Sequence, residues 1–321
     1  MSHLLKHTLL VGAGAMAIEY AKVLKAQGIQ FTCIGRSSAS AELFFNKTGI
    51  HAKTGGIRNY LNQNSKIPSS AIVCVSVDQL SQVTLELLNH GVKYILVEKP
   101  GGMKLEDIKK LAEESTKQNA TLYVAYNRRF YSSTLHARDF IMEDGGVQSF
   151  MFDFTELGHI LEKTKVNNII KENWFLANST HVIDLAYYLG GEPLSLHSYT
   201  SGSLSWHPSG SIYSGAGITK NGALFSYHAN WNAPGRWGIE LVTKKRRLLL
   251  KPLEELHIQK LGSFNYEKVT FKDDIDLLYK PGLFRLVESF FDDRKDKQLV
   301  SISEQYRKCL TLYEKMKKTI N

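Results

Sequence analysis

The first 126 residues alternate short apolar runs with segments in which apolar residues recur every three or four positions. The apolar runs lie at 8–11, 30–34, 71–75, 94–97 and 121–125. Segments of helical period lie between them, including 78–89 and 105–119. Near-continuous apolar strands that alternate with helices are typical of a parallel sheet covered on both faces. The pattern therefore predicts a doubly wound α/β domain of the Rossmann type over residues 1–126.

The pattern changes over residues 127–321. Between 195 and 271, apolar and polar residues alternate and are punctuated by Gly, Asn and Pro, which predicts antiparallel strands. We expect helices at 132–142, 180–189, 283–292 and 303–319, and strands at 147–154, 223–231, 238–243, 247–251 and 256–260. This predicts a second, α+β domain with a largely antiparallel open sheet over residues 127–321. The last helices could pack back on the first domain.

A glycine-rich turn joins the first predicted strand to the first helix. It has the form Gly-x-Gly-x-x-Ala, from Gly12 through Gly14 to Ala17. Gly12 would allow the tight turn, Gly14 would let backbone approach a pyrophosphate, and Ala17 would let helix and strand pack closely. The exposed amides at the helix start, including those of Ala15 and Met16, suit a pyrophosphate. The turn predicts a dinucleotide site.

The end of the second predicted strand indicates which dinucleotide binds. An acidic residue at this place marks NAD, but the chain has Arg36, Ser37 and Ser38 instead. A guanidinium and two hydroxyls suit a 2′-phosphate, which favours NADP(H) over NAD(H). The alternative is that Arg36 is a solvent-exposed loop residue.

The fourth predicted strand is followed by Glu98, Lys99 and Pro100, and then by two glycines. Ligands of open α/β sheets bind beyond the carboxyl ends of the strands, the edge that Val75 also reaches. A lysine ammonium there can hydrogen-bond a hydroxyl or ketone oxygen and stabilise developing negative charge. We therefore expect Val75, Glu98 and Lys99 at the cofactor site.

With these motifs, the chain resembles the family named for glucose-fructose oxidoreductase, inositol dehydrogenase and a rhizopine-catabolism protein. Three further segments are similar to it: Tyr-Asn-Arg-Arg-Phe at 126–130, His-Val-Ile-Asp-Leu at 181–185, and Gly-Ala-Leu-Phe-Ser at 222–226 with Trp231. The resemblance implies hydride transfer between a nicotinamide and a carbon of a sugar or polyol. It also implies that Lys99 orients the reacting oxygen and that His181 exchanges its proton. The resemblance further implies that residues 127–321 form the substrate-binding and oligomerisation domain of a homo-oligomer, either a dimer or a tetramer.

The chain departs from the family pattern at Ala177, where an Asp usually stands four residues before the histidine. Asn178, Asn173 or Glu172 could substitute for it, and Asp184 lies one turn farther along the helix. Arg128 is a candidate cofactor ligand. Other candidate substrate residues are Tyr126, Arg129, Asn178 and Asp184.

Composition limits the remaining possibilities. The 321 residues carry a net charge of +9, which is compatible with an anionic sugar as substrate, but the basic clusters are too short to suggest nucleic acid. No apolar run reaches the roughly 20 residues that a membrane helix needs. The amino-terminal residues lead straight into the first strand, so we expect no signal peptide. Three widely spaced cysteines suggest reduced thiols and the cytoplasm, and no zinc-type spacing is present, so we predict no metal.

The leading hypothesis is an NADP-dependent oxidoreductase acting on a sugar, nucleotide sugar or polyol, with Lys99 and His181 at the reacting atoms. The loss of the carboxylate at Ala177 motivates a second hypothesis, a cofactor-binding regulatory protein without turnover. A third is reduction of a non-sugar carbonyl on the same scaffold.

Overall fold

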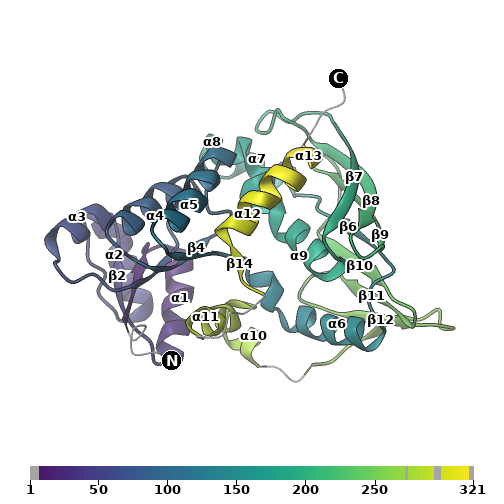
Figure 1. Ribbon diagram of the computed structural model, residues 1–321, viewed down its shortest axis with the longest axis horizontal. Helices are drawn as coiled ribbons and strands as arrows, with labels where there is room; N and C mark the ends of the chain where they lie inside the picture. Colours follow the sequence, from purple (N-terminus) through teal and green to yellow (C-terminus); the bar gives the residue numbers. More distant parts are fainter. Residues whose placement is uncertain (1–6, 272–273, 293–297, 318–321) are drawn as a thin grey trace. The chain divides into compact units, whose positions relative to one another are not determined.

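A computed structural model describes residues 7–271, 274–292 and 298–317 of the chain (Figure 1). The chain divides into two compact units. The first unit comprises Met1–Asn127 and Ile275–Arg307, and the second comprises Arg128–Asp274 and Lys308–Asn321. The boundary thus falls after Asn127, and the segment 275–307 returns to the first unit.

A six-stranded sheet forms the centre of the first unit, with the strand order β14-β5-β4-β3-β1-β2. Five strands are parallel, and the short β14 is antiparallel to β5. Buried apolar residues dominate the central strands, because both faces are covered. The strands are β1 (His7–Val11), β2 (Gln30–Ile34), β3 (Ser70–Val73), β4 (Tyr94–Glu98), β5 (Thr121–Ala125) and β14 (Val300–Ser301).

Helices cover this sheet in two groups (Figure 1). One group is α1 (Ala15–Ala26), α2 (Ser38–Thr48) and α11 (Leu283–Phe291), and the other is α3 (Gly56–Gln63), α4 (Leu80–Asn89) and α5 (Leu105–Lys117). The unit also contains the short α10 (Ile275–Leu278) and most of α12 (Ile302–Lys308). Local chemistry sets the helix ends: the Asp107 carboxylate accepts the Lys104 N–H at 3.2 Å at the start of α5, and Gly28 follows α1 with φ +68°.

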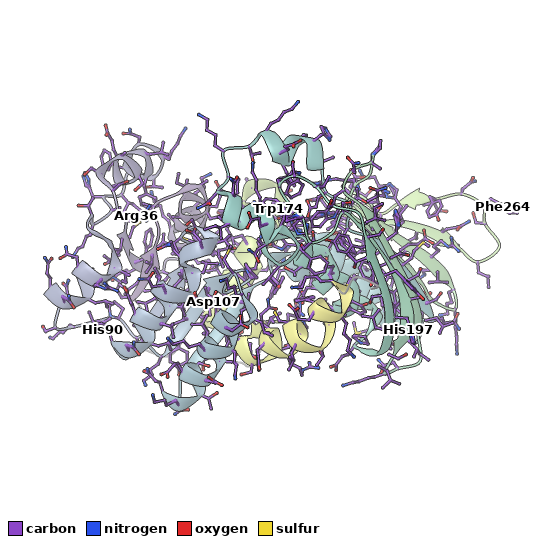
Figure 2. The ribbon with its side chains drawn as sticks, turned by 90° about the horizontal axis from the view of Figure 1, so that it is seen from above. Arg36, His90, Asp107, Trp174, His197 and Phe264 are labelled. Atoms are coloured by element: carbon purple, nitrogen blue, oxygen red, sulfur yellow. The ribbon has the colours of Figure 1, made fainter. Side chains whose placement is uncertain are left out.

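The second unit is built on an eight-stranded sheet with the order β13-β12-β11-β10-β6-β9-β8-β7. Only the β6–β9 pair is parallel among its described strands. The strands are β6 (Ser149–Asp153), β7 (Pro193–Ser201), β8 (Ile212–Thr219), β9 (Leu224–Asn230), β10 (Gly238–Val242), β11 (Arg246–Leu250), β12 (His257–Lys260) and β13 (Glu267–Lys268). Phe264 extends from the tip of the last hairpin, away from the sheet (Figure 2).

One face of this sheet packs against helix α9 (Thr180–Gly190). Aromatic rings fill the contact: Tyr187 meets Phe225 edge-on at 5.2 Å and Phe152 at 5.5 Å between ring centroids. The other helices of the unit are α6 (Ser132–Glu143), α7 (Gly158–Lys163), α8 (Asn168–Glu172) and α13 (Glu314–Met316), and π-helical turns span Phe175–Ser179 and Cys309–Tyr313. Phe225 of β9 is therefore covered by α9.

The predicted fold class is confirmed, with differences at the level of elements. The strand expected at 71–75 is β3, and the helix expected at 78–89 begins with the 3₁₀ turn Val77–Gln79. The expected helix 303–319 is interrupted by the π-helical turn Cys309–Tyr313, and positions 318 and 319 lie outside the described residues. The sequence did not reveal α2, α3, α7, α8 or β14, because each is short or only weakly periodic.

Candidate active site

A cleft of about 440 Å³ opens at the carboxyl ends of β1, β2 and β3 in the first unit. This is the edge at which doubly wound sheets bind nucleotides. Among the predicted cofactor residues, the cleft is lined by Gly12, Gly14, Arg36, Ser37 and Val75. Ala15, Met16 and Ser38 adjoin these residues in the chain but are not among those that line the cleft.

Gly12 and Gly14 of the turn differ in the space around them. Gly12 has φ +125°, and a Cβ atom there would lie 2.7 Å from the Cys74 carbonyl oxygen. A Cβ on Gly14 would meet nothing within 4 Å. Gly14 is the N-cap of α1, and no side chain caps the exposed amides there. The turn therefore leaves open space in front of a helix N-terminus, which suits an anion.

Arg36 is separated from β2 by Gly35 alone, and its side chain is exposed (Figure 2) and is among those that line the cleft. Ser37 is the N-cap of α2, and its hydroxyl accepts the Ser40 N–H at 3.3 Å. Glu86 also lines the cleft, but its carboxylate is paired with Arg58. The β2 end of the cleft thus presents the Arg36 guanidinium, which also acts electrostatically on Asp78, in the place where an NAD site would carry a carboxylate.

Glu98 is the last residue of β4, and Lys99 and Pro100 follow it, as expected. The side chains of Glu98 and Lys99 have different surroundings. Burial raises the pKa of the Glu98 carboxyl, although the Tyr20 hydroxyl donates a 2.8 Å hydrogen bond to it. Glu98 does not line the described cleft and contacts α1 instead. Lys99 is half-buried at the sheet edge. Glycine at 102 serves packing on α5, because a Cβ there would lie 2.6 Å from that of Asp107.

The turn after Lys99 is held by a side chain from the far end of the sequence. The Gln305 amide donates to the Pro100 carbonyl at 3.1 Å and lies 3.0 Å from the Tyr126 hydroxyl. Gln305 is fully buried, and Tyr126 is 1% exposed. Tyr126, a candidate substrate residue in the sequence, therefore supports the Lys99 turn.

His181 lies in the first turn of α9 in the second unit and is 7% exposed. Its ring lies 6.2 Å from that of Trp237, and the Arg128 guanidinium lies 4.9 Å from the centre of the same indole. Burial lowers the pKa of Arg128, and nearby Tyr131, Glu254 and Glu156 oppose this effect. The structure thus brings His181 and Arg128 together around one aromatic ring. Contact of Arg128 with the cofactor and proton exchange by His181 stay predictions.

The candidates Arg129 and Asp184 bind each other. Two hydrogen bonds of 2.7 and 2.8 Å join the guanidinium to the carboxylate, and Lys308 adds a third at 2.8 Å. Burial opposes ionisation of Asp184, but Arg129 and Lys308 outweigh it and lower its pKa to about 2. We therefore assign the pair to the structural core rather than to substrate binding, because its polar atoms are already satisfied.

Sequence reasoning missed one buried carboxylate close to the histidine helix. Glu156 is 3% exposed and accepts hydrogen bonds from the candidate Asn178 and from Ser179. Nothing local marks it, since it lies 22 residues from Asn178 in the chain. The other two substitutes considered for the absent Asp, Asn173 and Glu172, lie at the end of α8.

Residues 6–126 match the family model described as an oxidoreductase family with an NAD-binding Rossmann fold. This domain belongs to that oxidoreductase family. The resemblance inferred from the sequence motifs is thereby confirmed. A comparison with curated proteins gives no match.

Solved structures share the fold along nearly the whole chain. A UDP-N-acetylglucosamine 3-dehydrogenase from Acidithiobacillus ferrooxidans is 13% identical with a TM-score of 0.74, covering 97% of both chains. Levoglucosan dehydrogenase, in complex with NADH and levoglucosan, is 17% identical with a TM-score of 0.74, covering 97% of this chain and 95% of its own. An oxidoreductase from Agrobacterium radiobacter, in complex with NAD⁺, L-tartaric acid and magnesium, is 12% identical with a TM-score of 0.76, covering 98% and 95%.

Two further findings concern what the described residues lack. None of the described helices combines the length and apolarity that a bilayer crossing needs. Within the same residues, no group of three or more His, Cys, Asp or Glu side chains could hold a metal.

Proposed function

We propose that the chain is an NADP-dependent oxidoreductase that transfers hydride to or from a carbon of a sugar, nucleotide sugar or polyol. The family supports the reaction class, and the substrates named for two similar structures support the sugar class. The cofactor preference rests on one observation, the Arg36 guanidinium that lines the cleft at the end of β2. The charge of +9 supports an anionic substrate, and three buried free thiols support a reducing compartment, the cytoplasm.

The residues of the cleft fit a dinucleotide. The α1 amides beside the open space at Gly14 would hold the pyrophosphate, and Arg36 with Ser37 would hold the 2′-phosphate. When bound, the cofactor supplies the hydride chemistry. Arg128 is a further candidate cation for contact with the cofactor.

Lys99 and His181 carry the proton chemistry of this proposal. The Lys99 ammonium hydrogen-bonds the substrate oxygen and stabilises the negative charge that develops on it. The His181 imidazole takes the hydroxyl proton during oxidation and returns it during reduction, because its ordinary pKa lies near neutral pH. Asn178 is a further candidate for contact with a substrate hydroxyl.

A cofactor titration tests the proposed preference for NADP(H). NADPH and NADH binding are followed by nicotinamide fluorescence in the wild type and in Arg36→Ala. A lost charge-assisted hydrogen bond of about 1.5–3 kcal/mol predicts roughly 10- to 100-fold weaker NADPH binding and little change for NADH. Tighter binding of NADH than of NADPH by the wild type contradicts the assignment of Arg36.

The roles of Lys99 and His181 are tested by measuring turnover with a panel of sugars, nucleotide sugars and keto-sugars. Lys99→Ala and His181→Gln should each lose about 100-fold or more in kcat while binding NADPH normally. Near-normal turnover in both variants would overturn the roles given to these residues. NADPH binding with no oxidation or reduction across the panel, or reduction of non-sugar carbonyls alone, would instead favour the two alternative functions.

We also propose that the protein is a homo-oligomer and that the second copy covers the exposed face of the eight-stranded sheet. This face carries Met151, Tyr199 and Leu224, which are 51%, 58% and 61% exposed. A groove of about 540 Å³ runs across it, lined by residues that include His197 (Figure 2). Apolar side chains gathered on an open sheet face are typical of a protein–protein contact.

A further inference from the structure

Glu156 is a buried acidic side chain with a defined set of hydrogen-bond donors. Its two carboxylate oxygens each lie 3.1 Å from the Asn178 amide nitrogen, and the Ser179 hydroxyl donates to one of them at 2.7 Å. Glu156 is 3% exposed, so the carboxylate is withdrawn from water. A carboxylate is retained in such a place only where donors or cations compensate for the lost hydration.

The segment that carries Glu156 is fixed on both sides. Before it, the Phe154 ring packs edge-on against Phe175 with centroids 5.7 Å apart. After it, Gly158 lies so close to Trp231 that a Cβ atom would come 2.2 Å from the Trp231 carbonyl oxygen. The Trp231 indole donates back to the Phe154 carbonyl at 3.3 Å. The carboxylate therefore has a preorganised position.

The donors of Glu156 belong to the turn that leads into the histidine helix. Asn178 and Ser179 lie in the π-helical turn Phe175–Ser179, which continues without a break into α9. Asn178 and Ser179 thus lie three and two residues before His181 in one continuous helical segment, and their bonds to Glu156 hold the backbone that leads to the histidine. The same carboxylate acts electrostatically on Arg128, whose guanidinium shares the Trp237 ring with His181.

We propose that Glu156 is a positioning residue for His181: its ionised carboxylate holds the turn that carries the histidine and stabilises the imidazolium form. This rests on the proposed function, in which His181 exchanges the proton. It accounts for a histidine helix without a carboxylate at Ala177, because Glu156 reaches the start of the helix from the loop after β6. Asp184, three residues beyond His181 on α9, is instead paired with the two cations Arg129 and Lys308.

The charges around Trp237 determine whether loss of the Glu156 charge raises or lowers the pKa of His181. Arg128, with Arg236 beside it, disfavours a second cation there, and Tyr131, Glu254 and Glu156 face Arg128. Removing the negative charge of Glu156 leaves the cations less compensated. The pKa of His181 then falls, and the limb of the pH profile that His181 governs moves to lower pH in either reaction direction.

The test follows the imidazole signal of His181 by NMR in NADPH-saturated protein, with the signal assigned by its loss in His181→Gln. Glu156→Gln keeps the shape and removes the charge, and should lower the pKa of His181 by about 0.5–1 unit, less than the 1–3 units typical of a charge in direct contact. Glu156→Asp keeps the charge and should restore most of the shift. Glu192→Gln, which removes an exposed glutamate paired with Lys220, should leave the pKa unchanged.

An unchanged pKa of His181 in Glu156→Gln would overturn the proposal. If that variant does not fold, the carboxyl carbon of Glu156 is titrated in the wild type, where a carboxyl still protonated above pH 7 would overturn it equally. Neither measurement needs a substrate. Normal turnover in His181→Gln would therefore remove the catalytic role of His181, and no turnover by the wild type across the panel would remove the proposed function, while the NMR result still decides the relation between Glu156 and His181.

Discussion

At Gly12 and Gly14, the two glycines of the turn after β1, an added methyl group would meet different surroundings. The first would press on the Cys74 carbonyl at 2.7 Å in a backbone conformation with φ +125°, and the second would enter open space. One glycine therefore serves the fold, and the other leaves room for a ligand.

Gly14→Ala should change the free energy of unfolding by no more than about 0.5 kcal/mol, because the methyl group contacts nothing. It should weaken NADPH binding tenfold or more, because it occupies space in front of the α1 amides. Gly12→Ala should instead destabilise the fold by roughly 1–3 kcal/mol. Urea unfolding and fluorescence titration of both variants check this, and unimpaired NADPH binding by Gly14→Ala would contradict it.

The Asp184 carboxylate gives a prediction on stability. Its folded pKa of about 2 lies below the unfolded value, so its contribution is complete above pH ~4 and is lost as the pH falls toward 2. Asp184→Asn leaves Arg129 and Lys308 without their carboxylate and should cost about 3–5 kcal/mol at pH 7. Urea unfolding measures this, with the exposed Asp139→Asn on α6 as control. Equal stability of the two variants would contradict the structural role of the pair.

Among the elements, the short β14 and α12 support the turn that follows Lys99. β14 adds an antiparallel edge strand beside β5, and α12 follows it directly. This connection places Gln305 beneath the Pro100 turn, 205 residues away in the chain. The element supports the segment that presents Lys99 without supplying a reacting group.

Gln305→Ala should therefore lower kcat roughly tenfold with little effect on NADPH binding, because the Lys99 turn loses its support while the glycine turn is untouched. Steady-state kinetics and fluorescence titration check this. Gln118→Ala, which removes an exposed amide at the end of α5, is the matched control. A loss of NADPH affinity as large as the loss of kcat would show that α12 acts on the cofactor cleft instead.

At the scale of the whole molecule, the exposed face of the eight-stranded sheet is the surface at which we expect two copies to associate. One face is covered by α9, and the exposed apolar side chains Met151, Tyr199 and Leu224 lie on the other. A second copy would remove these side chains from water.

Met151→Glu should shift the protein from an oligomer toward the monomer, because a charge replaces an apolar side chain at the centre of the face. Light scattering after size-exclusion chromatography measures the mass. Leu261→Glu changes an 84% exposed leucine beyond β12 and should leave the mass unaltered. A monomeric wild type at micromolar concentration would contradict the proposed contact.

Much of the fold could be predicted because its signals are local. The strands of the first unit and the turn from Gly12 to Ala17 follow from apolar periodicity and glycine spacing within a few residues. The same holds for Arg36 at the end of β2 and Lys99 after β4, since the carboxyl ends of parallel strands share one edge.

The tertiary structure alone decided which polar groups meet. The partners of Asp184 are Arg129, 55 residues away, and Lys308, 124 residues away. The donors of Glu156 lie 22 and 23 residues along the chain, and no periodic pattern connects them. The sequence by itself thus determined the architecture and the cofactor motif, because periodicity and turn chemistry are properties of neighbouring residues. The roles of buried charged groups depend on contacts between distant segments, which exist only once the chain has folded.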